Sequence, residues 1–134
     1  MGKVELTIMD KLQATTAITS VVPATNIQAH ELRLSSASKQ IVVKDSLGAS
    51  EPILQAESGL ITILVYIKDS VDQPYKTCYN LLRLIQSTLD RLNESLTDSN
   101  SFVRKFLKQS GEVVYNSETQ EYMGQIVFSY VVGE

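Results

Sequence analysis

The sequence contains one histidine and one cysteine, residue types that often serve as the general base and the nucleophile of an enzyme. A Ser-His-Asp triad or a Cys-His pair would have to use His30, because the chain has no other histidine. No nucleophile motif accompanies His30, so we interpret it as a strand-edge residue without a catalytic role. Cys78 falls within an apolar stripe, where a free thiol behaves as a small hydrophobic side chain. One cysteine also excludes an internal disulfide and a thiolate metal cluster within one chain.

Two pairs of carboxylates are close enough in sequence to hold a cation or exchange protons, Asp69 with Asp72 and Asp90 with Glu94. The first pair flanks an expected helix start, where acidic side chains favour the helix dipole, and the second lies at an exposed helix end. The glycines are isolated and form no phosphate-binding loop. The sequence therefore predicts no enzyme, no cofactor and no metal site.

A small basic cluster lies on an expected strand and consists of Arg104, Lys105 and Lys108. Tyr115 and Tyr122 could supply aromatic rings on which bases stack. The net charge of −3 gives no long-range attraction to nucleic acid. We therefore favour a solvated strand face, or ion pairs to a neighbouring subunit, over nucleic-acid binding. A nucleic-acid binder stays open as an alternative, and a steep salt dependence of DNA binding would test it.

Hydrophobic periodicity indicates the elements that must position these residues. Apolar residues at helical spacing predict helices over residues 7–20 and 73–94, with Tyr75 and Cys78 in the apolar stripe of the second helix. β-branched runs and alternation predict strands over residues 27–32, 41–43, 59–68, 102–109, 113–115 and 122–132. Ser110 and Gly111 are expected to form a turn, and Phe128 and Gln125 are expected on opposite faces of the last strand. A chain of 134 residues is long enough for one core. This order predicts a single α+β domain over residues 1–134, with two helices packed on one face of a mostly antiparallel β-sheet.

Two segments are candidates for contact with partners. Residues 45–58, rich in small and polar residues, predict a long exposed loop, and loops of that length usually have a function. The strand over residues 59–68 is apolar on both faces, so that one face stays exposed if both helices cover the other. The candidate interface residues are Leu60, Leu64 and Tyr66 on that strand and Ile53 and Leu54 in the loop.

The N-terminal residues contain no apolar stretch typical of a signal peptide. The most apolar segment, residues 60–67, is much shorter than the roughly 20 residues that span a bilayer. We therefore expect synthesis in a reducing cytoplasm and no membrane contact.

The layout of the chain resembles the tail-terminator, or tail-to-head joining, proteins of long-tailed phages. The resemblance rests on the first helix over residues 8–20, the strand IVV at 41–43, a strand that leads into a long helix (LITILVYIKDSVDQPYKTCYNLLRLIQSTLD) and a C-terminal strand (GQIVFSYVV). It implies a virion protein, made in the host cytoplasm, that forms a hexameric ring at the head-proximal end of the tail. Such a ring stops tube polymerisation, contacts the tail-tube protein and the head connector, and lets DNA pass through. The family has no catalytic residues to transfer.

Other functions are open at this point. One is a different neck or minor tail component, such as a stopper, which gene position between a connector and a tail-tube gene would distinguish. Another is a non-viral oligomeric adaptor that binds a small ligand. The adaptor would need a concave pocket with convergent polar groups.

Overall fold

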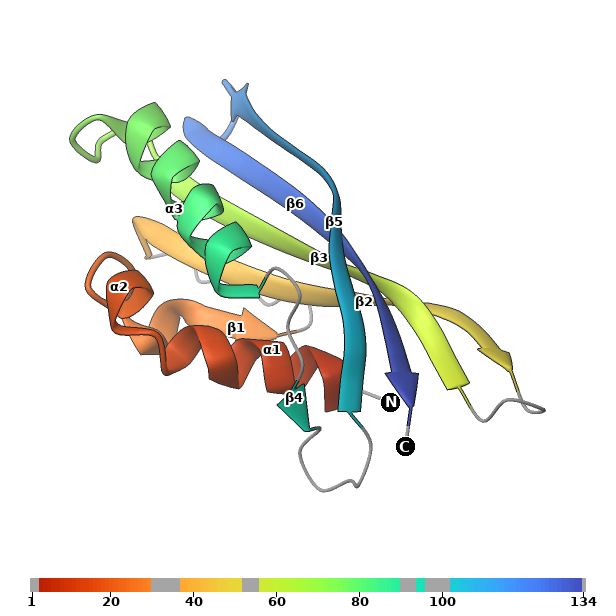
Figure 1. Cartoon of the computed structure of the whole chain (residues 1–134). Coiled ribbons are helices and arrows are strands. Elements are labelled where there is room, and N and C mark those ends of the chain that lie inside the picture. Colours follow the sequence, from red (N-terminus) through yellow and green to blue (C-terminus); the bar gives the residue numbers. More distant parts are fainter. Residues whose placement is uncertain (1–2, 30–36, 52–55, 90–93, 96–101, 134) are drawn as a thin grey trace.

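The computed structural model describes residues 3–29, 37–51, 56–89, 94–95 and 102–133 (Figure 1). Its elements are, in chain order, α1 (Lys3–Gln13), α2 (Thr16–Thr19), the 3-10 turn η1 (Ala24–Asn26), β1 (Ile27–Ala29), β2 (Lys39–Glu51), β3 (Ala56–Lys68), α3 (Pro74–Leu89), β4 (Glu94–Ser95), β5 (Phe102–Asn116) and β6 (Glu121–Gly133). His30, Ile53, Leu54 and Asp90 lie outside the described residues.

The strands form one sheet in the order β1-β2-β3-β6-β5-β4. The pairs β2–β3, β3–β6, β5–β6 and β4–β5 are antiparallel, and only β1 pairs with β2 in parallel. Helices α1 and α3 lie side by side on one face of this sheet (Figure 1). The predicted α+β class, with helices on one face of a mostly antiparallel sheet, is confirmed.

The core lies between the helices and the sheet face that they cover. Strand β3 directs every second side chain into it, because successive residues of a strand point to opposite faces. The buried apolar residues of this core are Ile27, Ile41, Val43, Ile61, Ile63, Val65, Ile67, Ile126, Phe128 and Tyr130 from the strands, Ile8 and Leu12 from α1, Ile18 from α2, Val22 after it, and Cys78, Leu81, Leu82, Ile85 and Leu89 from α3. Burying a side chain such as Ile63 stabilises the fold by about 1.5–3 kcal/mol. The stripe predicted for the second helix is therefore its core-facing side.

Helix α3 packs closely against Gly124 of β6. A Cβ atom there would lie 2.8 Å from Cys78 Sγ and 2.9 Å from Leu82 Cδ1. Such distances are shorter than van der Waals contact, so this position requires a residue without a side chain.

The predicted loop over residues 45–58 is wrong for most of its length. β2 continues to Glu51 and β3 begins at Ala56, and these two residues pair with each other. Small and polar residues have weak β propensity, but ladder hydrogen bonds use only the backbone, and pairing with a neighbouring strand overrides that weakness. A register shift between Leu47 and Ser50 absorbs the irregularity as a bulge.

Two further boundaries differ from the prediction for local reasons. The first helix is interrupted at Thr15, which has an extended backbone and donates its hydroxyl hydrogen to the carbonyl of Lys11 over 2.8 Å. The predicted turn at Ser110 and Gly111 lies inside the continuous strand β5. A register shift between Lys108 and Ser110 lets β5 keep its pairing with β6 through these residues.

Candidate protein interfaces

Of the side chains considered for chemistry, those of Cys78, Asp69 and Asp72 are described, and the thiol is buried whereas both carboxylates are exposed. Cys78 is fully buried, and its thiol is 3.9 Å from the carbonyl oxygen of Val65, to which it donates. Burial raises the pKa of this thiol, and a hydrogen bond from the Gly124 backbone lowers it by a smaller amount. The resulting pKa is about 11. A thiol that keeps its proton at neutral pH is a poor nucleophile.

The carboxylate of Asp69 takes part in a surface hydrogen bond and not in a metal or acid–base site. Asp69 is exposed and accepts a 2.9 Å hydrogen bond from the hydroxyl of Tyr115. That bond is the main cause that raises the pKa of Tyr115. Among the described residues, no three His, Cys, Asp or Glu side chains gather as a metal site would require. Nor does any described helix combine the length and hydropathy needed to cross a bilayer.

The first candidate interface is the sheet face opposite α1 and α3, which we call the far face. β3 presents Leu60, Leu64 and Tyr66 on it, as the alternation of the strand predicts. Leu60 is 44% exposed, and the other two are half-buried.

The exposed part of the far face extends from β3 toward β6 and β5. The register sets Leu64 between Val42 of β2, which is fully buried, and Gln125 of β6, while Met123 of β6 lies beside Tyr66. Val114 of β5 continues the apolar surface and is 42% exposed. Apolar side chains that remain this accessible on one face are typical of a surface that packs against another protein.

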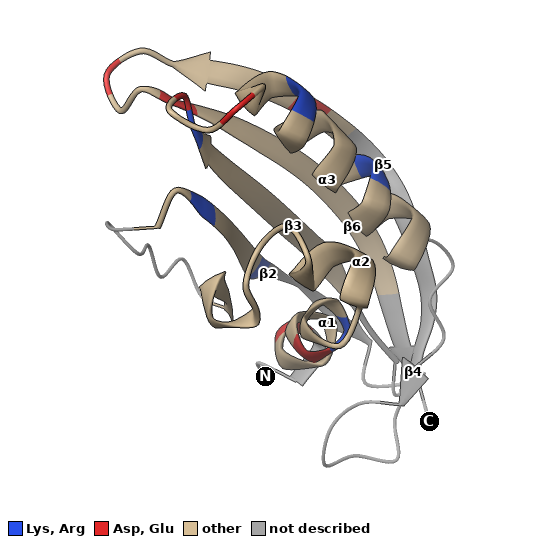
Figure 2. Cartoon of the chain, turned by 90° about the vertical axis from the view of Figure 1, so that its left-hand side faces the viewer, with Lys and Arg blue, Asp and Glu red and all other residues tan. Residues whose placement is uncertain are grey.

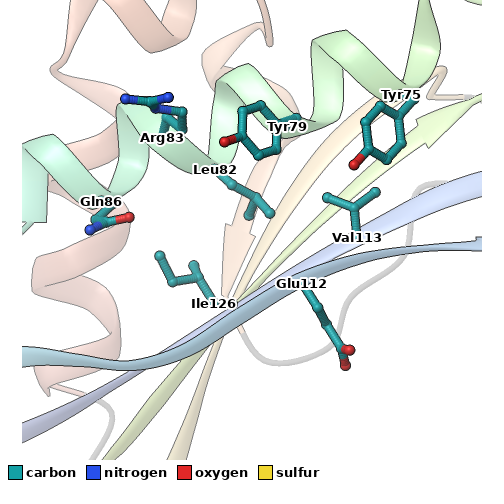
Figure 3. A pocket seen from close by; sticks show the side chains of 9 residues that line it. Tyr75, Tyr79, Leu82, Arg83, Gln86, Glu112, Val113 and Ile126 are labelled. Carbon is teal, nitrogen blue, oxygen red and sulfur yellow. The ribbon is translucent and has the colours of Figure 1, made fainter.

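The second candidate interface is a groove between α3 and β5, with a volume of about 360 Å³ (Figure 3). Its lining consists of Tyr75, Tyr79, Leu82, Arg83 and Gln86 from α3, Gly111, Glu112 and Val113 from β5, and Ile126 from β6. Leu82, Val113 and Ile126 lie between the two elements, and Glu112 points away from the helix (Figure 3). Sequence reasoning missed this groove because Gly111, which forms part of its wall, was expected to lie in a turn.

Four aromatic rings gather at the entrance of the groove and beside it. The rings of Tyr75 and Tyr79 stack with centroids 6.4 Å apart, and Tyr122 contacts Tyr75 at 6.0 Å and Tyr115 at 4.8 Å. The guanidinium of Arg83 lies 5.9 Å from the centroid of the Tyr79 ring. Tyr75, Tyr79 and Tyr115 are about half exposed. Exposed tyrosines together with an arginine are the residue types that protein interfaces favour.

The signal for these rings was present in the sequence. Tyr75, Tyr79, Arg83 and Gln86 recur at steps of four, four and three residues, which sets them along one side of a helix. Sequence analysis assigned Tyr75 to the core stripe. The structure instead sets it at the margin of that stripe, where it is 53% exposed.

Comparison with known proteins shows the fold. A chain of a solved structure described as "Virion of native gene transfer agent (GTA) particle" matches with a TM-score of 0.80 and 13% sequence identity, over 98% of this chain and 95% of that chain. A second solved chain, whose name states no role, matches with a TM-score of 0.61 and 12% identity, over 100% of this chain and 97% of that one. No family model and no curated protein matches the sequence.

Proposed function

We propose that this chain is a structural virion protein of a phage-like particle. The observation that carries the proposal is the likeness to a chain from the virion of a gene transfer agent, which extends over 98% of this sequence at a TM-score of 0.80. A match of nearly equal length on both sides means that the whole chain, and not an inserted domain, is compared.

Within the virion, we propose the role of a tail terminator. The protein would form a ring, a hexamer by the sequence resemblance, that caps the tail tube, stops its polymerisation and joins it to the head connector. A subunit of such a ring must contact neighbouring copies and also the layers above and below it. The far face and the groove are two separate surfaces that could serve these contacts.

The role needs binding and no catalysis. The buried thiol of Cys78 and the exposed carboxylate of Asp69, which Tyr115 engages, form no acid–base pair. We therefore propose a non-enzymatic protein that requires no cofactor, and we infer that Leu60, Leu64 and Tyr66 are buried by a neighbouring copy or an adjoining layer.

Deletion of the gene for this chain from the genome that carries it tests the proposal. Electron microscopy should then show tails of uncontrolled length and heads without tails, and the wild-type copy supplied in trans should restore joined particles of uniform length. Heads that carry tails of normal length in the deletion strain would refute a terminator role. Tails of normal length beside separate heads would instead indicate another neck component.

A further inference from the structure

The outer edge of β5 is open and regular over residues 111–116. β4 pairs with β5 only at residues 102–103, so no strand among the described residues pairs with this part of the outer edge. On its inner side the segment keeps an unbroken register with β6, because both shifts of β5 lie before Gly111. In a regular antiparallel pair, every second residue directs its N–H and C=O away from the partner strand. These outward groups can pair with an added strand.

The sequence of this edge lacks the usual protection against pairing. Exposed edges are commonly blunted by lysine, by proline or by a bulge. Residues 111–116, GEVVYN, contain neither lysine nor proline, and their one charged side chain, Glu112, points away from α3 (Figure 3). All of them except Val113 are exposed. An accessible edge of this composition is typical of a strand that pairs with another chain.

The groove runs along this edge. Gly111 and Val113 line it from β5, and α3 forms the opposite wall (Figure 3). Residues 111 to 115 extend for about 14 Å at about 3.4 Å per residue. The helix from Tyr75 to Gln86 covers about 16 Å at about 1.5 Å per residue. Edge and groove therefore match in length, and a strand added to β5 would direct every second side chain toward α3.

Contacts at one end of the groove hold its two walls together. The hydroxyl of Tyr115 donates to the Asp69 carboxylate over 2.9 Å, and the Asp69 backbone N–H donates to the carbonyl of Gln120 over 3.0 Å. The ring of Tyr122 contacts those of Tyr115 and Tyr75. These contacts join the end of β5 and the β5–β6 turn to the start of α3. A groove whose walls are already fixed binds an extended segment with less loss of entropy.

The described lining selects apolar side chains. α3 has two charged residues, Lys76 and Arg83 (Figure 2), and only Arg83 lines the groove. Glu112, the other charged residue of the lining, points away from the helix (Figure 3). A site for a small polar ligand needs several polar groups that converge, and this lining offers few. The residues between the two walls are apolar, and they are Leu82, Val113 and Ile126.

The described strands of a second copy offer no such segment. A second β5 would bring Val113 alone to the groove, because residue 111 is glycine and the Tyr115 hydroxyl is bonded within its own subunit. The two apolar residues of β1 are buried in their own subunit. Beyond its pairing with β1, β2 contains one apolar residue larger than alanine, Leu47. The segment must therefore come from a different protein.

We propose that an extended apolar segment of another protein of the particle adds to the outer edge of residues 111–116 as a further strand and seats alternate side chains in the groove. The inference rests on the proposed function, because it assigns this surface to a layer next to the ring. Backbone pairing supplies the affinity of such a contact, and the side chains in the groove supply its specificity.

Photo-cross-linking inside assembled particles tests this contact. The deletion strain receives a copy with p-benzoylphenylalanine in place of Tyr79, which lines the groove and is 45% exposed. Ultraviolet light should join this position to one short segment of another particle protein, identified by mass spectrometry of purified particles. The same probe in place of Ala17, which is exposed on α2, should not join that segment.

Two substitutions fill the groove from opposite walls, Gly111→Phe from β5 and Gln86→Phe from α3. Gly111 has no positive φ, so its backbone accepts a side chain. Each variant should keep the wild-type circular dichroism and lower the yield of the cross-link by about tenfold or more, because the added ring occupies the space of the segment. Gly111→Ala, which leaves the groove open, should keep the wild-type yield. Either filling variant that folds is sufficient for the test.

Hydrogen exchange distinguishes an added strand from contact through side chains alone. In the free chain, the amides of residues 111–116 that point outward should exchange faster than those bonded to β6. In the particle, the same amides should be protected by pairing with the added strand.

Several results would overturn the inference. They are a cross-link to a second copy of this chain, no cross-link in particles that contain the chain, an unchanged yield in the folded filling variants, and outward amides that exchange equally fast in the free chain and in the particle. Each of these leaves the terminator role intact. Purified wild-type particles that lack this chain would instead refute the proposed function, and the inference with it.

Discussion

Leu64 and Ile63 are adjacent residues of β3 that point to opposite faces, and they give the sharpest test of the far face. Leu64 is half-buried in the free subunit, whereas Ile63 is fully buried beneath the helices. Full burial of a leucine stabilises a fold by about 1.5–3 kcal/mol, so Leu64→Glu should remove about half of that, on the order of 1 kcal/mol. A domain with about 5–15 kcal/mol of stability should remain folded after this loss.

The same substitution should have a much larger effect on assembly. An unpaired carboxylate buried in an apolar interface costs several kcal/mol, and a loss of about 4 kcal/mol corresponds to roughly a thousandfold in affinity. We expect Leu64→Glu to show near-normal circular dichroism and a cooperative calorimetric transition, to form no closed rings in electron microscopy, and to fail to restore particles in the deletion strain. Ile63→Glu should unfold the domain, because it places the carboxylate in the core and also removes a fully buried side chain.

The control is Leu64→Met, which keeps an apolar side chain of similar volume and should assemble normally. Normal rings and full complementation by Leu64→Glu would refute the assignment of the far face to an interface. Unfolding of Leu64→Glu to the same extent as Ile63→Glu would show instead that the far face belongs to the core.

Three further predictions concern the interior and the aromatic end of the molecule. Gly124→Val should destabilise the fold by about 1–3 kcal/mol in urea titrations, because its side chain would overlap Cys78 and Leu82, and retention of the full wild-type midpoint would contradict the packing described. The pKa of the Cys78 thiol is raised from 9.0 to about 11, so the folded state binds this proton more tightly than the unfolded state does. The contribution of the thiol to the free energy of unfolding should be fully present below pH 9 and decrease as the pH rises toward 11, by about 1 kcal/mol at pH 10. Cys78→Ala should be less stable at pH 7 and lack that alkaline loss. Asp69→Asn should lower the pKa of Tyr115 toward its ordinary value in an ultraviolet titration, because the hydrogen bond to a carboxylate is the main cause of the shift; an unchanged titration would exclude that bond in solution.

The central elements of the fold could be predicted because their patterns are strong and repeated. β3 alternates Ile61, Ile63, Val65 and Ile67, and each of these is buried beneath the helices. The apolar stripe of α3 predicted both the helix and the side that it buries, because the same residues satisfy helical periodicity and core packing. The opposite faces predicted for β6 are likewise observed, with Phe128 buried and Gln125 half-buried on the far face.

The outer parts of β2 and β5 could not be predicted, because pairing with a neighbouring strand determines how far each strand extends and residue composition does not. The residues near Gly48 and Ser110 have weak β propensity, yet each lies in a strand that a neighbour extends by backbone hydrogen bonds. Bulges let these strands continue past irregular residues, and nothing in a single sequence marks a bulge reliably. The groove was missed with them, since its β5 wall exists only when residues 110–111 are extended.

The position of β6 in the sheet bears on how the chain folds during synthesis. β6 is the last strand in the sequence, yet it lies between β3 and β5 and contributes Ile126, Phe128 and Tyr130 to the core. Until β6 has been made, β3 lacks one of its two neighbouring strands. The apolar side of α3 then also lacks the β6 side chains against which it packs. An emerging chain therefore exposes an unpaired central strand beside an apolar helix, the combination that holdase chaperones bind and that aggregates most readily. β6 must leave the ribosome before the core can close, so the sheet and its helices should pack together only after β6 has been made.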